Sequence, residues 1–337
     1  MCTFAVDIYH TMKILITGAS GFIGSFIVEE ALRQGMEVWA AVRKSSSKQY
    51  LTDTRINFVE LNLDSEDQIK EALKDLSFDY VVHAAGATKC LNPDDFYRIN
   101  TEGTKNLVNA IISMKMSIRR FVYMSSLSIF GPVREDMPYT EIREDDTPQP
   151  NTAYGKSKLA AEKFLDSLKN FPYVVLRPTG VYGPREKDYA MMVDSIRNHV
   201  DFAVGFKKQD ITFVYVRDVV QAVFLALQKG TTGRKYFLSD GKVYDSSTFS
   251  DLIHEKLGKP WWIRVKAPLW LLKIITACGE MIGKMTGKMT ALNNDKYNIL
   301  KQRNWRCDIT PAIEELGYKP QYDLKAGVDE WLGNTAK

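Results

Sequence analysis

The sequence lacks any long uninterrupted hydrophobic run. In its 337 residues there is no stretch of about 18 uncharged apolar residues, so we expect no transmembrane helix. Residues 1–11 contain Asp7 and lack both a basic start and a continuous apolar core, which excludes a typical signal peptide. Met12 resembles a natural chain start. We therefore interpret residues 1–11 as a leader or a disordered tail and predict a cytoplasmic protein.

Cysteine is scarce and charge is nearly balanced. The four cysteines, Cys2, Cys90, Cys278 and Cys307, form no CxxC pair and have no histidine cluster nearby. This pattern excludes a disulfide framework and a metal site of the zinc type, and it predicts a reducing compartment. The net charge of +4 is too small to indicate a nucleic-acid partner.

What the sequence does contain is a regular alternation of two kinds of segment. Hydrophobic residues make up 45% and charged residues 26% of the chain, as in an ordinary globular protein. Short apolar runs alternate with amphipathic segments in the first half: KILIT, SFIVEEALRQG, EVWAAV, SEDQIKEALKDL and YVVHAAG. Strands that alternate with helices predict right-handed βαβ units, and therefore an α/β fold with a parallel sheet covered on both faces.

Three glycines follow the first apolar run. Gly18, Gly21 and Gly24 stand in LITGASGFIGS, between a predicted strand and a predicted helix. Glycines at this spacing permit a tight turn and a close approach of the backbone to a pyrophosphate, which also meets the N-terminus of the helix. Glycines can also simply end a strand, but the βαβ context favours a dinucleotide site.

The end of the second predicted strand bears on the choice of dinucleotide. An NAD site usually places an acid there to hold the ribose hydroxyls, whereas this chain reads Ala41-Val42-Arg43-Lys44-Ser45. Arg43 and Lys44 would suit a 2′-phosphate, so the residues favour NADP(H), although NAD(H) remains compatible with them. The alternative is a solvated basic loop.

The segment YGKSK is a candidate for acid–base chemistry. Tyr154 and Lys158 are four residues apart in a predicted helix, so both side chains lie on one face. A neighbouring ammonium, together with an oxidised nicotinamide ring, would stabilise the phenolate and bring the pKa of the phenol towards the working range. Upstream, a serine of YMSSLSIFG at a strand end could polarise a substrate carbonyl. The alternative is an ordinary exposed Tyr–Lys pair.

Taken together, these motifs resemble those of the extended short-chain dehydrogenases/reductases, also called the NAD-dependent epimerase/dehydratase family. The resemblance extends from Met12 to about Gly333 and includes TGASGFIG, HAAG, NTEGT, SSLSIFG, YGKSK, LRPTGVYGP and FVYVRDV. It implies a Rossmann-type, doubly wound parallel sheet with a smaller, discontinuous C-terminal substrate domain. The nucleotide domain would comprise residues 12–178 and about 211–229, and the substrate domain 179–210 and 230–337.

The resemblance also assigns roles to individual residues. It implies a catalytic triad of Ser126, Tyr154 and Lys158, in which Ser126 is preferred to Ser125 because it lies five residues before Gly131. Phe130 replaces a usual tyrosine, Asn62 replaces a frequent aspartate, and Asp218 is interpreted as a helix cap. The implied cofactor-binding residues are Gly18, Ser20, Gly21, Phe22, Ile23, Gly24, Arg43, Lys44, Asn62, Leu63, Ala84, Ala85, Gly86, Tyr154, Lys158, Pro178 and Thr179.

Departures from the family's motifs reduce the number of reactions that this chain is expected to catalyse. Leu127 and Ser128 occupy the positions of the acidic pair of sugar-nucleotide dehydratases, so elimination of water would lack its acid and base. Thr179 and Ile211 stand where nucleotide-sugar enzymes often have an asparagine and a diphosphate-binding arginine.

The chain is therefore closer to the branch of 3β-hydroxysteroid dehydrogenases and dihydroflavonol reductases. The predicted reaction interconverts a ketone and a secondary alcohol on a bulky apolar molecule, such as a steroid, a keto-sphingoid lipid or a flavonoid-like compound. A nucleotide-sugar 4-epimerase that holds NAD tightly is the alternative, because Lys207 and Lys208 could bind a diphosphate. A cofactor-sensing binding protein is disfavoured because the triad is complete.

The C-terminal third is basic and apolar. Residues 261–306 contain nine Lys or Arg and two Asp or Glu, a net charge of +7, so the remainder of the chain is at −3. The apolar segment 268–288 could line a substrate pocket, rest on an anionic membrane, or form a core or dimer helix. A homodimer is expected only by analogy with the family.

Overall fold

The computed structural model describes residues 11–258, 261–287 and 293–333, and a seven-stranded parallel sheet lies at its centre. The strand order is β10-β6-β5-β4-β1-β2-β3, and every neighbouring pair is parallel. The strands are β1 (Lys13–Thr17), β2 (Glu37–Val42), β3 (Asn57–Glu60), β4 (Tyr80–His83), β5 (Arg120–Met124), β6 (Tyr173–Pro178) and β10 (Lys235–Leu238). This arrangement confirms the predicted Rossmann-type doubly wound sheet.

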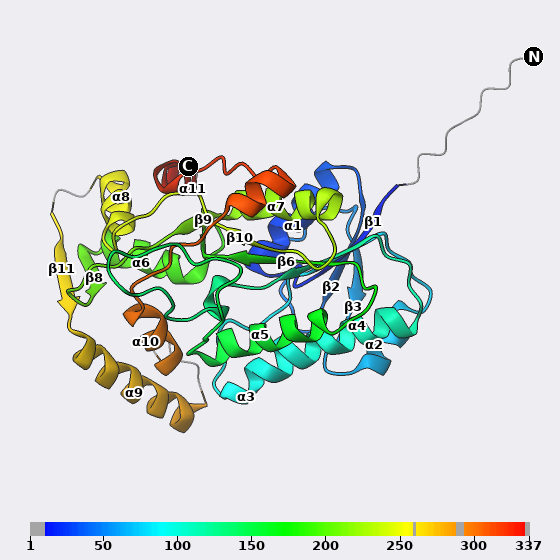
Figure 1. The fold of residues 1–337 in the computed structure, drawn as a ribbon, viewed down its shortest axis with the longest axis horizontal. Helices are drawn as coiled ribbons and strands as arrows, with labels where there is room; N and C mark the ends of the chain where they lie inside the picture. Colours follow the sequence, from blue (N-terminus) through cyan, green and yellow to red (C-terminus); the bar gives the residue numbers. More distant parts are fainter. Residues whose placement is uncertain (1–10, 259–260, 288–292, 334–337) are drawn as a thin grey trace, which may run out of the picture.

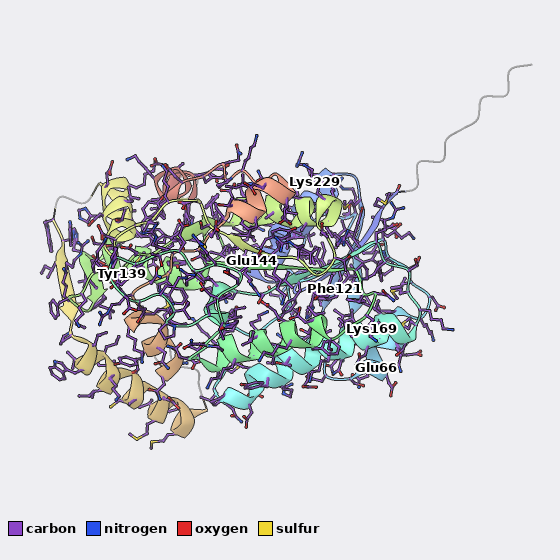
Figure 2. All side chains as sticks on the ribbon, viewed as in Figure 1. Glu66, Phe121, Tyr139, Glu144, Lys169 and Lys229 are labelled. Carbon is purple, nitrogen blue, oxygen red and sulfur yellow. The ribbon has the colours of Figure 1, made fainter. Side chains whose placement is uncertain are left out.

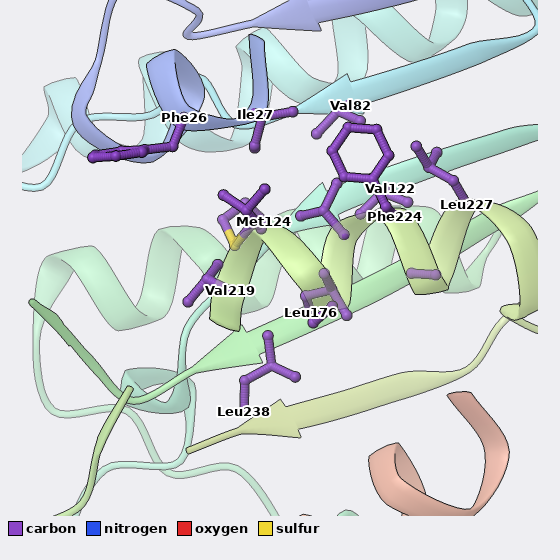
Figure 3. Packing of buried hydrophobic residues seen from close by; sticks show 14 of the residues in the cluster. Phe26, Ile27, Val82, Val122, Met124, Leu176, Val219, Phe224, Leu227 and Leu238 are labelled. Carbon is purple, nitrogen blue, oxygen red and sulfur yellow. The ribbon is translucent and has the colours of Figure 1, made fainter. Parts of the chain in front are cut away.

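Helices cover both faces of this sheet (Figure 1). On one face lie α1 (Phe22–Arg33) and α7 (Val216–Lys229), and on the other lie α2 (Glu66–Leu73), α4 (Gly103–Ser113) and α5 (Ala153–Asp166). In β1, Ile14 and Ile16 pack into the core below α1 and α7, whereas Leu15 between them packs into the opposite core. Because successive strand residues point to opposite faces, a continuous apolar run fills both layers. Figure 3 shows side chains of α1 and α7, such as Ile27 and Phe224, meeting Val122 and Leu176 of the sheet.

A second region lies beyond the carboxyl end of the sheet, at the left of Figure 1. It contains two parallel strand pairs, β7 (Gly180–Tyr182) with β9 (Phe213–Tyr215) and β8 (Val200–Val204) with β11 (Ile263–Ala267). Its helices are α6 (Lys187–Arg197), α8 (Thr248–Leu257), α9 (Leu269–Thr286), α10 (Asn294–Lys301) and α11 (Leu324–Gly333). An aromatic core that includes Tyr182, Phe213 and Phe249 holds it together.

The predicted division into a nucleotide domain and a substrate domain stays a prediction, and two strands pair across its boundaries. β10 lies in the stretch 230–337 assigned to the substrate domain, yet it pairs with β6 at the edge of the central sheet. β9 lies in the stretch 211–229 assigned to the nucleotide domain, yet it pairs with β7 in the second region. Both strands therefore lie across a predicted boundary from the region with which they pair, which shifts two boundaries without adding a crossing.

Short helical turns connect the larger elements. They are α3 (Pro93–Phe96), the π-helix η1 (Tyr97–Glu102), the 3₁₀ turn η2 (Leu127–Ile129) and the π-helix η3 (Ala312–Leu316). Asp218, in the first turn of α7, does not cap that helix as predicted. Its carboxylate instead accepts hydrogen bonds from the backbone N–H groups of Gln321 (2.9 Å) and Tyr322 (3.0 Å), so its structural role is to hold the segment before α11.

Candidate active site

The carboxyl ends of the parallel strands bring most of the predicted cofactor residues to one edge of the sheet. Gly18 follows β1, Ala84 to Gly86 follow β4, and Thr179 follows β6. The Ala84 N–H donates to the Thr17 carbonyl oxygen (3.2 Å), and the Ala85 N–H donates to Thr17 Oγ1 (3.3 Å). In an open parallel sheet this edge, beside the reversal of strand order at β1 and β4, is where a dinucleotide binds.

The glycine turn has the geometry that a pyrophosphate requires. Gly18 has φ +69°, and a Cβ atom there would lie 2.6 Å from the Ala85 nitrogen; a Cβ atom on Gly24 would lie 2.1 Å from the Gly18 carbonyl oxygen. Gly21, the residue before α1, provides no side-chain cap, so N–H groups of the first helical turn remain available to an anion. Ser20, Phe22 and Ile23 complete this turn, and the arrangement fits a dinucleotide.

A buried histidine supports the turn from below. His83 Nδ1 lies 2.7 Å from Thr17 Oγ1, and its Nε2 lies 3.0 Å from Thr104 Oγ1, so the ring connects β1, β4 and α4. Burial lowers the pKa of His83 to about 3, which keeps the imidazole neutral. Sequence reasoning gave this residue no role, although it stands within the motif HAAG.

The end of β2 borders a cavity of about 390 Å³. Exposed Arg43 and Lys44 line it together with Ser45, Glu60, Leu61 and Asn62. Glu60 is a charged neighbour that sequence reasoning missed, because its pairing opposite Val42 follows only from the strand register. The cavity therefore carries two cations and one carboxylate.

Asn62 and Leu63 are placed differently from each other. The side chain of Asn62 donates to Gln68 Oε1 (3.0 Å) and accepts from the Asp64 N–H (3.1 Å), so it organises the turn before α2 while lining the cavity. Leu63 does not line the cavity and packs against the core under α2, α4 and α5, where a Cβ atom added to Gly103 would lie 3.3 Å from the Cβ of Leu63.

The three predicted catalytic residues converge where β5 meets α5. α5 begins after Thr152, whose Oγ1 accepts from the Gly155 N–H (2.9 Å), and this cap fixes the turn that carries Tyr154. Burial raises the pKa of Tyr154, and a hydrogen bond with Ser126 partly opposes the increase. The phenol is consequently protonated at neutral pH and lies beside the Ser126 hydroxyl.

Lys158 lies one helical turn after Tyr154 and is 4% exposed. Its Nζ donates to the Met124 carbonyl oxygen (2.8 Å) and lies 4.8 Å from the centre of the Tyr123 ring. Burial lowers the pKa of Lys158 to about 8, an effect that Glu162 opposes. The side chain is therefore mostly an ammonium at pH 7, next to Gly86, where a Cβ atom would approach Nζ to 3.0 Å.

The two adjacent serines after β5 have different partners. Ser126 Oγ lies 3.1 Å from Ser128 Oγ and accepts from the Ser128 N–H, on the side of Tyr154. Ser125 Oγ donates to Glu162 Oε1 (2.5 Å) in the interior. Consecutive residues of an extended segment point in opposite directions, so only Ser126 is placed beside the phenol.

A buried ion pair beneath the triad was not anticipated. The guanidinium of Arg177 donates to Glu162 from Nη2 (2.6 Å) and Nε (3.2 Å), and the two side chains are 5% and 1% exposed. Lys235 Nζ lies 3.7 Å from the same carboxylate. The helical spacing of Tyr154, Lys158 and Glu162 could have indicated this position.

Asn100 organises the loop after β4 from within the π-helix η1. Its Oδ1 accepts from the Ala87 N–H (2.7 Å), and its Nδ2 donates to the Ala87 carbonyl oxygen (3.0 Å) and to Ser157 Oγ (2.9 Å). The amide thus ties the loop to the helix of Tyr154. π-Helical turns often occur at functional sites, and no pattern in the sequence predicts this one.

A carboxylate from α10 reaches the start of α5, the helix that carries Tyr154. Asp295 accepts hydrogen bonds from the N–H groups of Ala153 (3.1 Å) and Tyr154 (3.2 Å). Negative charge at a helix N-terminus is stabilising, so Asp295 fixes the first turn of α5. A cavity of about 210 Å³ adjoins this contact, lined by Lys89, Cys90, Leu91, Pro93, Phe96, Ala153, Glu280, Asn293, Asn294 and Asp295.

Pro178 and Thr179 end β6 beside the same edge. The Thr179 N–H donates to the Leu238 carbonyl oxygen (3.0 Å), and its hydroxyl lies 2.9 Å from both the carbonyl oxygen and Oγ1 of Thr212. The hydroxyl of Thr179 is therefore engaged within the protein.

Comparisons with known proteins agree with this geometry. Residues 14–239 match the model of the NAD dependent epimerase/dehydratase family. A UDP-glucose 4-epimerase of Vibrio cholerae is 28% identical over 97% of this chain and 96% of its own. A decarboxylating sterol-4-alpha-carboxylate 3-dehydrogenase of Dictyostelium discoideum is 25% identical over 94% and 99%. The crystal structure of a Thermotoga maritima UDP-glucose 4-epimerase with UDP-glucose superposes with a TM-score of 0.77 at 23% identity, covering 97% of this chain and 100% of that one.

Proposed function

Because the chain belongs to the NAD-dependent epimerase/dehydratase family, we propose that it is an NADP(H)-dependent oxidoreductase that interconverts a ketone and a secondary alcohol on a bulky apolar molecule. The observation that carries the proposal is the convergence of Ser126, Tyr154 and Lys158 at the carboxyl edge of the sheet. Steroids, keto-sphingoid lipids and flavonoid-like ketones are the substrate classes considered.

Each of the three side chains has a distinct task in this reaction. The nicotinamide, when bound, supplies or accepts the hydride. Tyr154, whose pKa is raised by burial, holds its proton at neutral pH and can donate it to the carbonyl oxygen. Ser126 orients that oxygen by a hydrogen bond, and the Lys158 ammonium binds the ribose and stabilises the phenolate left after proton transfer.

The surroundings of the site support an uncharged substrate. Thr179 is bonded to Thr212, and the backbone of Ile211 pairs with Tyr244, so neither position offers a cation to a diphosphate. Lys208 lies 3.1 Å from Asp210, which partly neutralises it. A diphosphate requires paired charged donors, and among these positions only Lys207 and the partly neutralised Lys208 carry a positive charge.

A nucleotide-sugar 4-epimerase is the second candidate. The 28% identity to the Vibrio cholerae UDP-glucose 4-epimerase favours it, and so does Lys89, which lines the cavity next to Asp295. Lys89 and Lys296 both pair with Asp188, however, so their charge is already shared with a carboxylate.

The test that separates the two candidates follows the absorbance of NADPH or NADH. Purified protein is mixed with a panel of steroid, sphingoid and flavonoid-like ketones and, separately, with UDP-sugars. Steady oxidation of NADPH with a ketone is the expected result. Interconversion of a UDP-sugar with catalytic cofactor and no net oxidation would instead establish the epimerase.

Arg43 and Lys44 provide a prediction about cofactor preference. Replacing both by alanine is expected to raise the KM for NADPH by roughly 10–100-fold, because a hydrogen bond to a charged group contributes about 1.5–3 kcal/mol. The KM for NADH should stay near its original value. The control is Lys48→Ala, which removes an exposed cation that lies 4.1 Å from the Phe58 ring instead of lining the cavity. Equal changes for both cofactors would show that the cations do not select a 2′-phosphate.

The assembly and the location of the protein stay predictions. A homodimer rests on analogy with the family alone, and a cytoplasmic location rests on the sequence. Gel filtration with light scattering tests the first, and fractionation of cells that express the protein tests the second.

A further inference from the structure

On helix α9 most of the large apolar side chains face solvent instead of the protein. The side facing the rest of the protein contains Leu272, Thr276 and Gly283, all buried. The opposite side presents a stripe of large apolar side chains that are 53–79% exposed, namely Trp270 (65%), Ile274 (53%), Met281 (59%) and Met285 (79%). Their spacing of 4, 7 and 4 residues places them on one face. A large exposed apolar surface of this kind indicates that another molecule or a membrane covers it.

The adjoining strand pair β8–β11 continues this surface. Val265 pairs with Phe202 in register, and both are exposed, as is Ile263 two residues earlier on the same face. Arg264, which points the other way, bonds Asp201 (2.6 Å) on the protein side. The outer face of this small sheet is therefore apolar, while its inner face carries the ion pair.

Strand and helix together form one band, here called the apolar rim. It consists of Phe202, Phe206, Trp261, Ile263, Val265, Trp270, Ile274, Ile275, Met281, Ile282 and Met285. These are eleven of the eighteen exposed large hydrophobic side chains in the described ranges 11–258, 261–287 and 293–333. β11 and α9 follow one another along a single outer edge of the molecule, and side chains project outward from both (Figures 1 and 2).

The charge of the rim indicates what covers it. Residues 261–287 contain four Lys or Arg and a single acid, Glu280, and Lys266 and Lys273 are exposed. Tryptophans at the border of an apolar surface with cations beside them are typical of segments at a lipid interface. A second copy of the chain is a poorer partner, since a two-fold dimer through this rim would bring the same cations together.

The length and hydrophobicity of α9 define how this helix can be oriented at a membrane. α9 has 18 residues, which corresponds to about 27 Å at 1.5 Å per residue. Across the described part of the chain, no helix combines the length and apolarity needed to cross a bilayer. Such a helix lies in the plane of the interface with its apolar stripe among the acyl chains.

We propose that the apolar rim docks the protein on an anionic lipid bilayer, with α9 parallel to the membrane surface. Trp270 and Ile274 enter the acyl region, together with Phe202 and Val265 of the strand pair. Lys273 contacts the anionic headgroups. Lys266 lies on the face of β11 opposite Val265, but it is exposed near the end of the strand, where its long side chain reaches the headgroups. The inference rests on the exposed surface and its charge, and is independent of the reaction that the protein catalyses.

The experiment is co-sedimentation of the full chain with vesicles of phosphatidylcholine alone or mixed in equal parts with phosphatidylserine. Binding to the anionic vesicles is expected, and it should weaken at high salt. Trp270→Ser with Ile274→Ser should weaken it at least about 10-fold, since burying one large apolar side chain contributes about 1.5–3 kcal/mol. Lys266→Gln with Lys273→Gln should weaken it roughly 30-fold at low salt, at about 1 kcal/mol per cation.

Matched controls test whether the location of the apolar groups matters. Met137→Ser and Ile112→Ser remove exposed apolar side chains outside the rim, which are 62% and 47% exposed. These variants should bind like the original protein, and all variants should keep its melting temperature because the altered groups are exposed. The proposal is overturned by failure to bind anionic vesicles, or by binding that the rim variants leave unchanged. A dimer that Trp270→Ser dissociates would also overturn it, because a second copy would then cover the rim.

Discussion

Replacing Tyr154 by phenylalanine is expected to lower kcat for ketone reduction by about 10²–10⁴-fold, the usual contribution of a positioned general acid. The ring still packs against Phe96, whose centroid lies 6.2 Å away, so the fold of α5 is preserved. Only the hydroxyl beside Ser126 is lost. The dissociation constant for NADPH, measured by fluorescence titration, should therefore change little while kcat falls.

The control for this variant is Tyr97→Phe, which removes the hydroxyl of an exposed tyrosine on η1 and should leave kcat unchanged. The serine pair gives a second comparison. Ser126→Ala should lower kcat, whereas Ser125→Ala should act mainly on stability because its hydroxyl bonds buried Glu162. If Tyr154→Phe kept the original kcat, the phenol could not be the proton donor.

Glu162→Gln is expected to lower the free energy of unfolding by about 3–5 kcal/mol, because removing one charge of a buried pair leaves the other uncompensated. The guanidinium of Arg177 is 5% exposed and donates two hydrogen bonds to this carboxylate. Urea denaturation of the purified protein measures the change. A smaller effect on activity is expected as well: the Glu162 carboxylate raises the pKa of Lys158, so its loss should move the alkaline limit of activity to lower pH.

Two further variants test whether the expected loss of stability in Glu162→Gln is caused by the burial of its ion pair with Arg177. Glu30→Gln breaks a pair of comparable geometry with Arg33, 2.6 Å apart on the exposed side of α1, and should cost at most about 1 kcal/mol. The double variant Glu162→Leu with Arg177→Met should recover much of the lost stability, since an apolar pair leaves no buried charge. Equal stability of Glu162→Gln and Glu30→Gln would contradict the importance of the buried pair.

The sequence was informative where chemistry depends on local spacing. Gly18, Gly21 and Gly24 indicated the turn through their spacing, and at Gly18 and Gly24 close backbone contacts leave no room for a Cβ atom. The four-residue interval between Tyr154 and Lys158 likewise fixes their common helical face. The parallel sheet followed from apolar runs such as that of β1, where neighbouring residues fill opposite cores.

Contacts between distant segments were not predictable in the same way. β10 joins β6 after an excursion through the second region, and Glu60 reaches the cavity of Arg43 only through strand register. Asp295 bonds the start of α5 across 141 positions of sequence. Such pairings depend on the folded path of the chain, which a single sequence does not display.

The contact of Asp295 has a consequence for the order in which the protein becomes active during synthesis. Strands β1 to β6 and the helix that carries Tyr154 leave the ribosome first, with the N–H groups of Ala153 and Tyr154 still lacking their carboxylate partner. Translation at about 5–20 residues per second delays residue 295 by roughly 7–28 seconds after Tyr154. A nascent chain can thus contain every residue of the proposed triad and still lack the carboxylate that holds the helix of Tyr154, so we expect full activity to be acquired late in translation.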